Sequence, residues 1–174
     1  MKYDRNSYGD RYENIAIVNQ GEIGISSSES KSPILATSGL GVCISLSGWS
    51  PEQKIGFLTH WPCKKSVRNT FPVLNDILLN SSNEPTDFEV RIVGGGNPFS
   101  EEMEWIKYSK EHLEQVKQLV SEQNWKLIEE DSWGVPGRFL DPNRNKIQKD
   151  LENKSYARSI ALDCRTGQAL AYKS

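Results

Sequence analysis

A cysteine and a histidine in this sequence have the residue types and spacing of a nucleophile and its base. Cys43 lies in an apolar run that ends at Trp49, and His60 lies in a second run that begins at Lys54. The Ser-Pro-Glu-Gln segment between the runs has turn chemistry, so the two runs predict a β-hairpin. If Trp49 and Lys54 close that four-residue loop, Cys43 falls directly opposite His60, with Cβ atoms about 4.5–5.5 Å apart. The spacing therefore predicts a Cys–His pair in which the imidazole takes the thiol proton.

The residues before the cysteine supply the other groups that such chemistry needs. Gly39 and Gly41 allow the backbone to approach a substrate closely. We expect backbone N–H groups here, at Gly39, Gly41 and Val42, to form an oxyanion hole. Thr37 is predicted to accept a hydrogen bond from the second ring nitrogen of the histidine and to orient the ring, as Asp or Asn does in other enzymes.

The remaining cysteines and histidine are expected to have structural roles. Cys63 is an odd number of positions from His60 and points to the other face of a continuing strand, and Cys164 begins a turn. His112 lies at the edge of an apolar helical face. Neither a CxxC nor an HExxH motif is present, so no metal site is expected.

The elements that must position these residues are mostly short strands. Helical periodicity covers 69–80, with Pro72 in its first turn, and 101–123. Glycine-bearing turns are predicted at 38–41 and 94–96. Since most strands are joined by short turns, the pattern predicts an α+β fold with antiparallel or mixed sheets. The predicted strands are 14–18, 21–26, 42–49, 55–61, 88–93, 126–130, 158–163 and 168–172.

Length and composition are those of one soluble domain spanning 1–174. Residues 1–13 form a polar extension without the apolar stretch of a signal peptide, and the cysteine count is odd, so a reducing, cytoplasmic location is expected. The formal net charge of -2 argues against a broad nucleic-acid surface. The longest apolar runs are far shorter than the roughly 20 residues of a membrane span.

The run TSGLGVC (37–43) resembles the nucleophile motif T-x-G-L-G-S-C of the chemoreceptor glutamine deamidase family CheD. That family carries a histidine seventeen residues after its cysteine, and His60 stands at this distance here. The similarity continues weakly through VRIVGGGNPF (90–99), 124–131 and RSIALDCRTGQA (158–169). It covers most of the chain.

The resemblance implies a β-sandwich core flanked by helices, with Cys43 as nucleophile, His60 as base and Thr37 as orienting residue. No metal or organic cofactor is implied. Val42 departs from the family's serine at that position, and 133–156 corresponds to an inserted loop. These departures leave the three site residues in place and leave the substrate open.

The function expected on this basis is deamidation of glutamine side chains to glutamate on a protein substrate, such as a chemoreceptor or another signalling protein. A regulatory protein partner is also expected. The family's wider group includes bacterial toxins that deamidate host glutamines, so one alternative is an effector secreted into a host cell. A second alternative is a non-catalytic module that binds a signalling partner.

Overall fold

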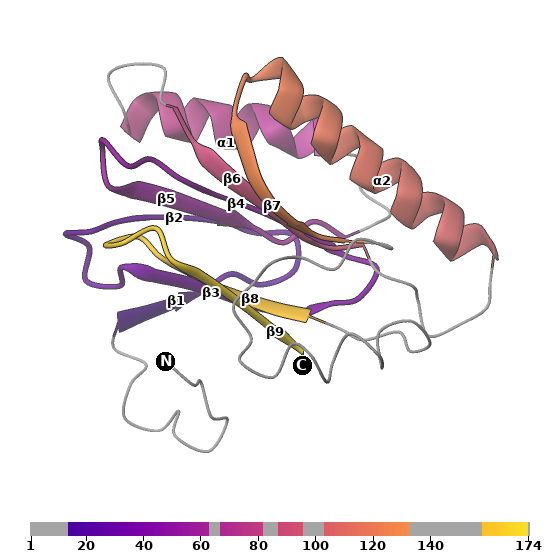
Figure 1. The fold of residues 1–174 in the computed structure, drawn as a ribbon, viewed down its shortest axis with the longest axis horizontal. Coiled ribbons are helices and arrows are strands. Elements are labelled where there is room, and N and C mark those ends of the chain that lie inside the picture. The colour runs from indigo at the N-terminus through magenta and orange to yellow at the C-terminus, as the bar shows by residue number, and fades with distance from the viewer. Residues whose placement is uncertain (1–13, 63–66, 82–86, 96–102, 133–157, 174) are drawn as a thin grey trace.

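The computed structural model describes residues 14–62, 67–81, 87–95, 103–132 and 158–173, which form two packed sheets and two helices (Figure 1). The polar extension and the inserted loop expected from the sequence lie outside the described residues. The strands are β1 (Ile15–Ile17), β2 (Ile23–Ser27), β3 (Ile34–Leu40), β4 (Ile44–Trp49), β5 (Ile55–Thr59), β6 (Glu89–Gly94), β7 (Lys126–Asp131), β8 (Arg158–Asp163) and β9 (Ala169–Lys173). The helices are α1 (Val67–Ser81) and α2 (Met103–Glu122).

The two sheets are mixed and stack into a sandwich. One has the strand order β1-β3-β8-β9 and the other the order β2-β5-β4-β6-β7. The β1–β3 and β6–β7 pairs are parallel, and the other pairs are antiparallel. Both helices cover the outer face of the five-stranded sheet (Figure 1). The α+β fold with a sandwich-like core flanked by helices is therefore confirmed.

The central strand β4 is buried on both of its faces, and its two serines, Ser45 and Ser47, are buried with its apolar residues. Its residues Ile44 and Leu46 belong to the core between the five-stranded sheet and the helices. Trp49 and the preceding Cys43 belong to a second core, which lies between the two sheets. The second core holds residues of both sheets: Val18, Leu35, Leu40, Cys43, Trp49, Leu58, Val93, Ile160, Leu162 and Cys164.

The predicted hairpin forms, but its predicted register is wrong by two residues. Trp49 pairs with Gly56, and the Ser50 N–H donates to the Ile55 carbonyl. Within the loop, the Ser50 hydroxyl accepts the Gln53 N–H at 3.2 Å. Side chains alternate with a period of two, so a slip of two residues leaves every side chain on its predicted face.

Two other predictions need correction. The turn predicted at 38–41 is largely the end of β3, where the register shifts between Thr37 and Leu40 and Gly39 takes a φ of 77°. Only glycine reaches this left-handed conformation at little cost, so the Gly-containing segment forms a β-bulge. Helix α1 already includes Val67, and Pro72 therefore lies in its second turn.

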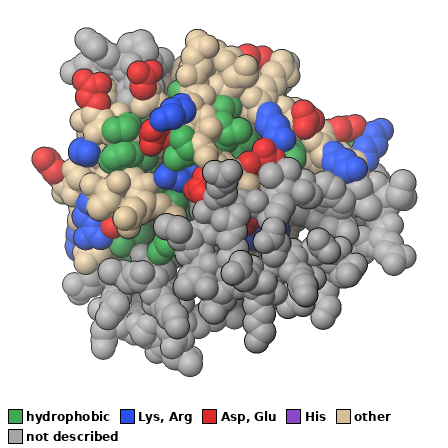
Figure 2. Space-filling model, viewed as in Figure 1, with side chains coloured by type: hydrophobic (Ala, Val, Ile, Leu, Met, Phe, Trp, Pro, Cys, Tyr) green, Lys and Arg blue, Asp and Glu red, His purple; other side chains and the backbone are tan. Residues whose placement is uncertain are grey.

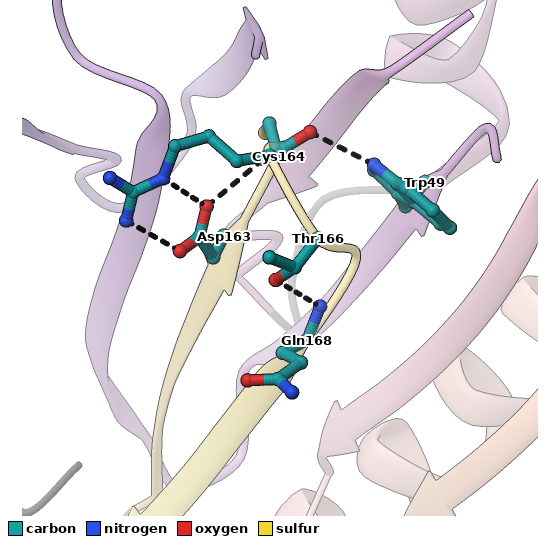
Figure 3. A network of polar contacts seen from close by, with 6 residues as sticks. Trp49, Asp163, Cys164, Thr166 and Gln168 are labelled. Carbon is teal, nitrogen blue, oxygen red and sulfur yellow. Dashed lines mark hydrogen bonds and ion pairs between the residues drawn. The ribbon is translucent and has the colours of Figure 1, made fainter. Parts of the chain in front are cut away.

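The β8–β9 hairpin ties the two sheets together at the end of β4 that is distant from Cys43 (Figure 3). The indole N–H of Trp49 donates to the Cys164 carbonyl at 3.0 Å. Gly167 takes a φ of 71°, and a Cβ there would lie 2.3 Å from the Trp49 ring. The turn can therefore close over the indole only because residue 167 is glycine.

His112 on α2 is buried, as expected from its place at the edge of an apolar helical face. It is 3% exposed, and neither ring nitrogen has a hydrogen-bond partner among the described residues. Burial disfavours the charged imidazolium and lowers the pKa of His112 from 6.5 to about 4.

His112 should make the protein less stable in acid. Between its folded and unfolded pKa values the unfolded chain binds more protons, so stability falls as pH falls. Going from about pH 7 to about pH 5, this residue alone should remove about 2 kcal/mol of unfolding free energy. Urea unfolding of His112→Gln should show a correspondingly smaller loss over that interval. Glu111→Gln, at the exposed neighbouring position, should retain the wild-type loss, and an equal loss in His112→Gln would contradict the assignment.

Candidate active site

Thr37 and His60 meet between the two sheets. The Thr37 hydroxyl oxygen lies 2.8 Å from Nδ1 of His60 and 2.6 Å from the carbonyl oxygen of Val18. Thr37 comes from β3 in one sheet, whereas His60 directly follows β5 in the other. Both are buried, at 3% and 5% exposure. The contact predicted between the threonine and the second ring nitrogen is therefore present.

These two contacts fix which ring nitrogen of His60 carries the proton. A hydroxyl has one hydrogen, and a carbonyl oxygen can only accept, so the Thr37 hydroxyl donates to Val18. It then accepts from Nδ1–H of His60. In the neutral ring this leaves Nε2 unprotonated, with a lone pair available for a proton. Burial lowers the pKa of His60 below 6.5, so the ring is neutral at physiological pH.

The backbone carbonyl of Cys43 is held by a hydrogen bond from the chain at the end of β6. The Gly95 N–H donates to the Cys43 carbonyl at 2.8 Å. A Cβ on Gly94 would lie 2.3 Å from that carbonyl oxygen, and Gly94 and Gly95 take φ values of 99° and 64°. The glycine run predicted to form a sharp turn thus also allows β6 to approach the backbone of Cys43.

Cys43 and His60 share a face of the sheet but are not directly opposite each other. The bridge between Ile44 and Trp61 continues the observed register, which places His60 across from Ser45. Cys43 and His60 are then diagonal neighbours, for which Cα separations are about 7–8 Å. Nε2 of His60 has no hydrogen-bond partner among the described residues. The prediction that Cys43 and His60 lie directly opposite each other is therefore wrong. The prediction that their side chains lie on the same face of the sheet agrees with the observed register.

A crossover segment, residues 18–22, contacts all three predicted site residues. It links β1 of one sheet to β2 of the other. Besides the Val18 contact with the Thr37 hydroxyl, its Gly21 N–H donates to the His60 carbonyl at 2.7 Å. The side-chain amide of Gln20 lies 3.4 Å from Sγ of Cys43. Gln20 was not predicted, because a contact across 23 residues leaves no local pattern.

The backbone N–H groups near Cys43 are only partly available for an oxyanion. The Gly41 N–H donates to the Gly39 carbonyl at 2.9 Å, and the Ile44 N–H donates to the Trp61 carbonyl at 3.0 Å. The expected role of Gly41 as a donor is therefore not supported in this arrangement. The Val42 N–H has no backbone acceptor within the described part of the chain.

The second described thiol, Cys164, is unsuited to nucleophilic chemistry. It is fully buried, and its sulfur would lie 2.5 Å from a Cβ placed on Gly56. Burial and the Asp163 carboxylate raise the pKa of Cys164 to about 12. Cys63 lies outside the described residues. Among the described residues no group of three or more His, Cys, Asp or Glu side chains is placed to hold a metal ion.

The surface carries charges of both signs. Acidic and basic side chains are interspersed over the described part of the face seen in Figure 2. Neither of the two described helices is long and apolar enough to cross a membrane.

Comparison with models of known protein families gives no match, and comparison with curated proteins gives no significant match. The geometry of Thr37, Cys43 and His60 and the resemblance of the sequence motifs around them therefore provide the evidence for a function.

The tautomer of His60 can be measured directly. We expect nitrogen NMR of the wild-type protein to show Nδ1 protonated and Nε2 unprotonated at neutral pH. Thr37→Val removes the acceptor while keeping the shape, and it should increase the population of the Nε2–H tautomer. Thr37→Ser keeps the hydroxyl and should retain the wild-type spectrum. A wild-type ring protonated at Nε2 would contradict the assignment.

Cys43 should be the more reactive of the two described thiols. A thiol with a pKa of about 12 is ionised to only about one part in 10⁴ near pH 8. Brief treatment with iodoacetamide, followed by peptide mapping, should therefore label Cys43 well before Cys164. The Cys63→Ser background removes the third thiol from this comparison. Preferential labelling of Cys164 there, or of Cys63 in the wild type, would contradict the choice of nucleophile.

Proposed function

We propose that this protein is a cysteine amidohydrolase that deamidates glutamine side chains on a protein substrate. The observation that carries the proposal is the Thr37–His60 contact, which leaves Nε2 of a neutral imidazole as a free base beside the Cys43 loop. His112 is also buried, but neither of its ring nitrogens has a partner among the described residues, so nothing there orients one nitrogen as a base as Thr37 does for His60. The resemblance of the Thr37, Cys43 and His60 motifs to the CheD family supports the same chemistry.

The first half of the proposed reaction forms a thioester. Nε2 of His60 takes the proton of the Cys43 thiol, and the resulting thiolate attacks the carboxamide carbon of the substrate glutamine. The C=O electron pair moves onto oxygen as the S–C bond forms. When the tetrahedral intermediate collapses, its C–N bond breaks, and the nitrogen leaves as ammonia with the proton from His60.

The second half regenerates the thiol. His60, neutral again after giving up its proton, removes a proton from a water molecule, which attacks the thioester carbonyl. Breaking the C–S bond releases glutamate and returns the proton to sulfur. Thr37 contributes by holding Nδ1 protonated and the ring fixed, so that Nε2 acts as the base in both halves. The low pKa of His60 keeps that base unprotonated at neutral pH.

The proposed substrate is a protein that presents an accessible glutamine, and a bacterial signalling receptor is the substrate class that the resemblance suggests. Conversion of a neutral amide to a carboxylate adds one negative charge to the substrate. A change of this kind alters local electrostatics in the same way as other charge-changing modifications. Action inside the cell that makes the protein fits this substrate class.

The reaction can be tested without knowing the substrate in advance. A bacterial extract is incubated with the protein in water that carries a heavy oxygen isotope, and its peptides are examined by mass spectrometry. We expect particular glutamines to become glutamates that contain one heavy oxygen atom, because the water oxygen enters the product carboxylate. Cys43→Ala and His60→Ala should each abolish this conversion.

The matched control is Cys164→Ala, which removes a thiol that takes no part in the proposed chemistry. It should convert the same glutamines if it folds, as checked by its circular dichroism and melting temperature. Equal isotope incorporation by the wild type and by folded Cys43→Ala would refute the proposal.

A further inference from the structure

Gln20 places a hydrogen-bond donor against the proposed nucleophile. Its side-chain Nε2 lies 3.4 Å from Sγ of Cys43. Gln20 is exposed, whereas Cys43 is 6% exposed, so the amide reaches inward from the surface to a buried sulfur. The Cys43 thiol is therefore contacted by a neutral amide donor. This donor comes from the 18–22 segment and not from the hairpin or from Thr37.

The backbone beneath Gln20 is fixed by a tight turn. The Glu22 N–H donates to the Asn19 carbonyl at 3.0 Å, and Gly21 takes a φ of 87°, as the third residue of a type II turn requires. The Glu22 carboxylate accepts the Asn19 N–H at 2.8 Å. Because the Gly21 N–H also donates to the His60 carbonyl, the turn is anchored to the strand that carries the proposed base.

An oxyanion that forms on carbon bound to Cys43 needs donors, and several neighbouring backbone groups are already engaged. The N–H groups of Gly41, Ile44 and Gly95 each donate to a backbone carbonyl. Val42 offers a backbone N–H on the nucleophile loop. A side chain can add a donor to these backbone groups, and Gln and Asn amides can fill this role.

We propose that Gln20 is a catalytic residue that donates its side-chain N–H to the oxyanion. The inference rests on the proposed acyl-transfer chemistry. As Sγ bonds to the carbonyl carbon, the C=O electron pair moves onto oxygen, and Nε2–H of Gln20 hydrogen-bonds to that oxygen. No proton leaves Gln20. When the intermediate collapses, the C=O bond re-forms, the leaving group departs and the hydrogen bond weakens.

The observed distance suits this role. The oxyanion forms on the carbon attached to sulfur, so it lies two bonds from Sγ. A donor 3.4 Å from Sγ in the free protein can reach an oxygen there at the usual 2.7–3.1 Å, to a rough approximation. The same amide contacts the sulfur before substrate binds, so the donor is already in place.

The test compares two reactions of Cys43 in the full chain. Acylation by p-nitrophenyl acetate passes through an oxyanion, whereas alkylation by iodoacetamide does not. We expect Gln20→Ala to lower the acylation rate about 10²–10³-fold, the usual cost of one oxyanion donor. Its alkylation rate on the high-pH plateau, where the thiol is fully ionised, should stay within about two-fold of the wild-type rate, because no oxyanion donor is used in that reaction.

Two further variants sharpen the comparison. Gln20→Glu keeps the shape but replaces the donor with a carboxylate, so it should slow acylation more than Gln20→Ala does. Gln168→Ala removes an exposed glutamine from the β8–β9 hairpin and should leave both rates unchanged.

Each alternative result has its own meaning. If acylation and plateau alkylation fall together in Gln20→Ala, the amide acts on the thiol itself and the oxyanion role is overturned. If neither rate falls, the role of Gln20 is overturned while acylation of Cys43 still supports the proposed function. If wild-type Cys43 is alkylated but never acylated, the proposed function fails and this inference fails with it. Conversion of Gln20 to glutamate that depends on Cys43 would make Gln20 a substrate and overturn its role as a donor.

Discussion

The hydrogen bond between His60 and Thr37 joins the two sheets, and the rest of the candidate site depends on it. His60 follows β5 of the five-stranded sheet, and Thr37 lies in β3 of the four-stranded sheet. The bond can form only when the sheets pack at their native separation. Val18 then sets its direction, because the Thr37 proton is committed to the Val18 carbonyl. The defined tautomer of the His60 imidazole thus depends on the packing of the whole sandwich and not on one loop.

Cys43 is positioned by close backbone approach instead of side-chain packing alone. Two successive glycines at the end of β6 let its carbonyl meet the Gly95 N–H at 2.8 Å. Opposite this contact, the Gln20 turn reaches the sulfur. Cys43 is therefore contacted by two segments whose glycines have positive φ values. Gly21 and Gly94 allow the backbone of these segments to adopt positive φ values, which other residues adopt only at a cost.

The sequence predicts the fold class and most of the strands, because these follow from local composition or from a period of two. The Thr37–His60 contact is expected for another reason, namely the position of Thr37 six residues before Cys43 and the family motif that this run resembles. Register is harder to predict, since loops closed at Trp49–Lys54 or at Ser50–Ile55 both have four residues and both bury the same faces. The observed loop is closed by hydrogen bonds of Ser50 with Gln53, Lys54 and Ile55, and single hydrogen bonds of this kind have no periodic signature. Gln20 has no signature either, because its relation to Cys43 exists only after the sheets have packed.

The low exposure of Cys43 and His60 bears on which substrate group suits the site. A group that reaches them must leave water, and this transfer costs much less for a neutral carboxamide than for a carboxylate. A glutamine amide can recover its lost hydrogen bonds from donors such as Gln20, whereas a glutamate product carries a charge into the same low-dielectric space. Under the proposed chemistry the product is therefore bound less favourably than the substrate. Burial of the site would thus favour release of the product while keeping the imidazole neutral for the next cycle.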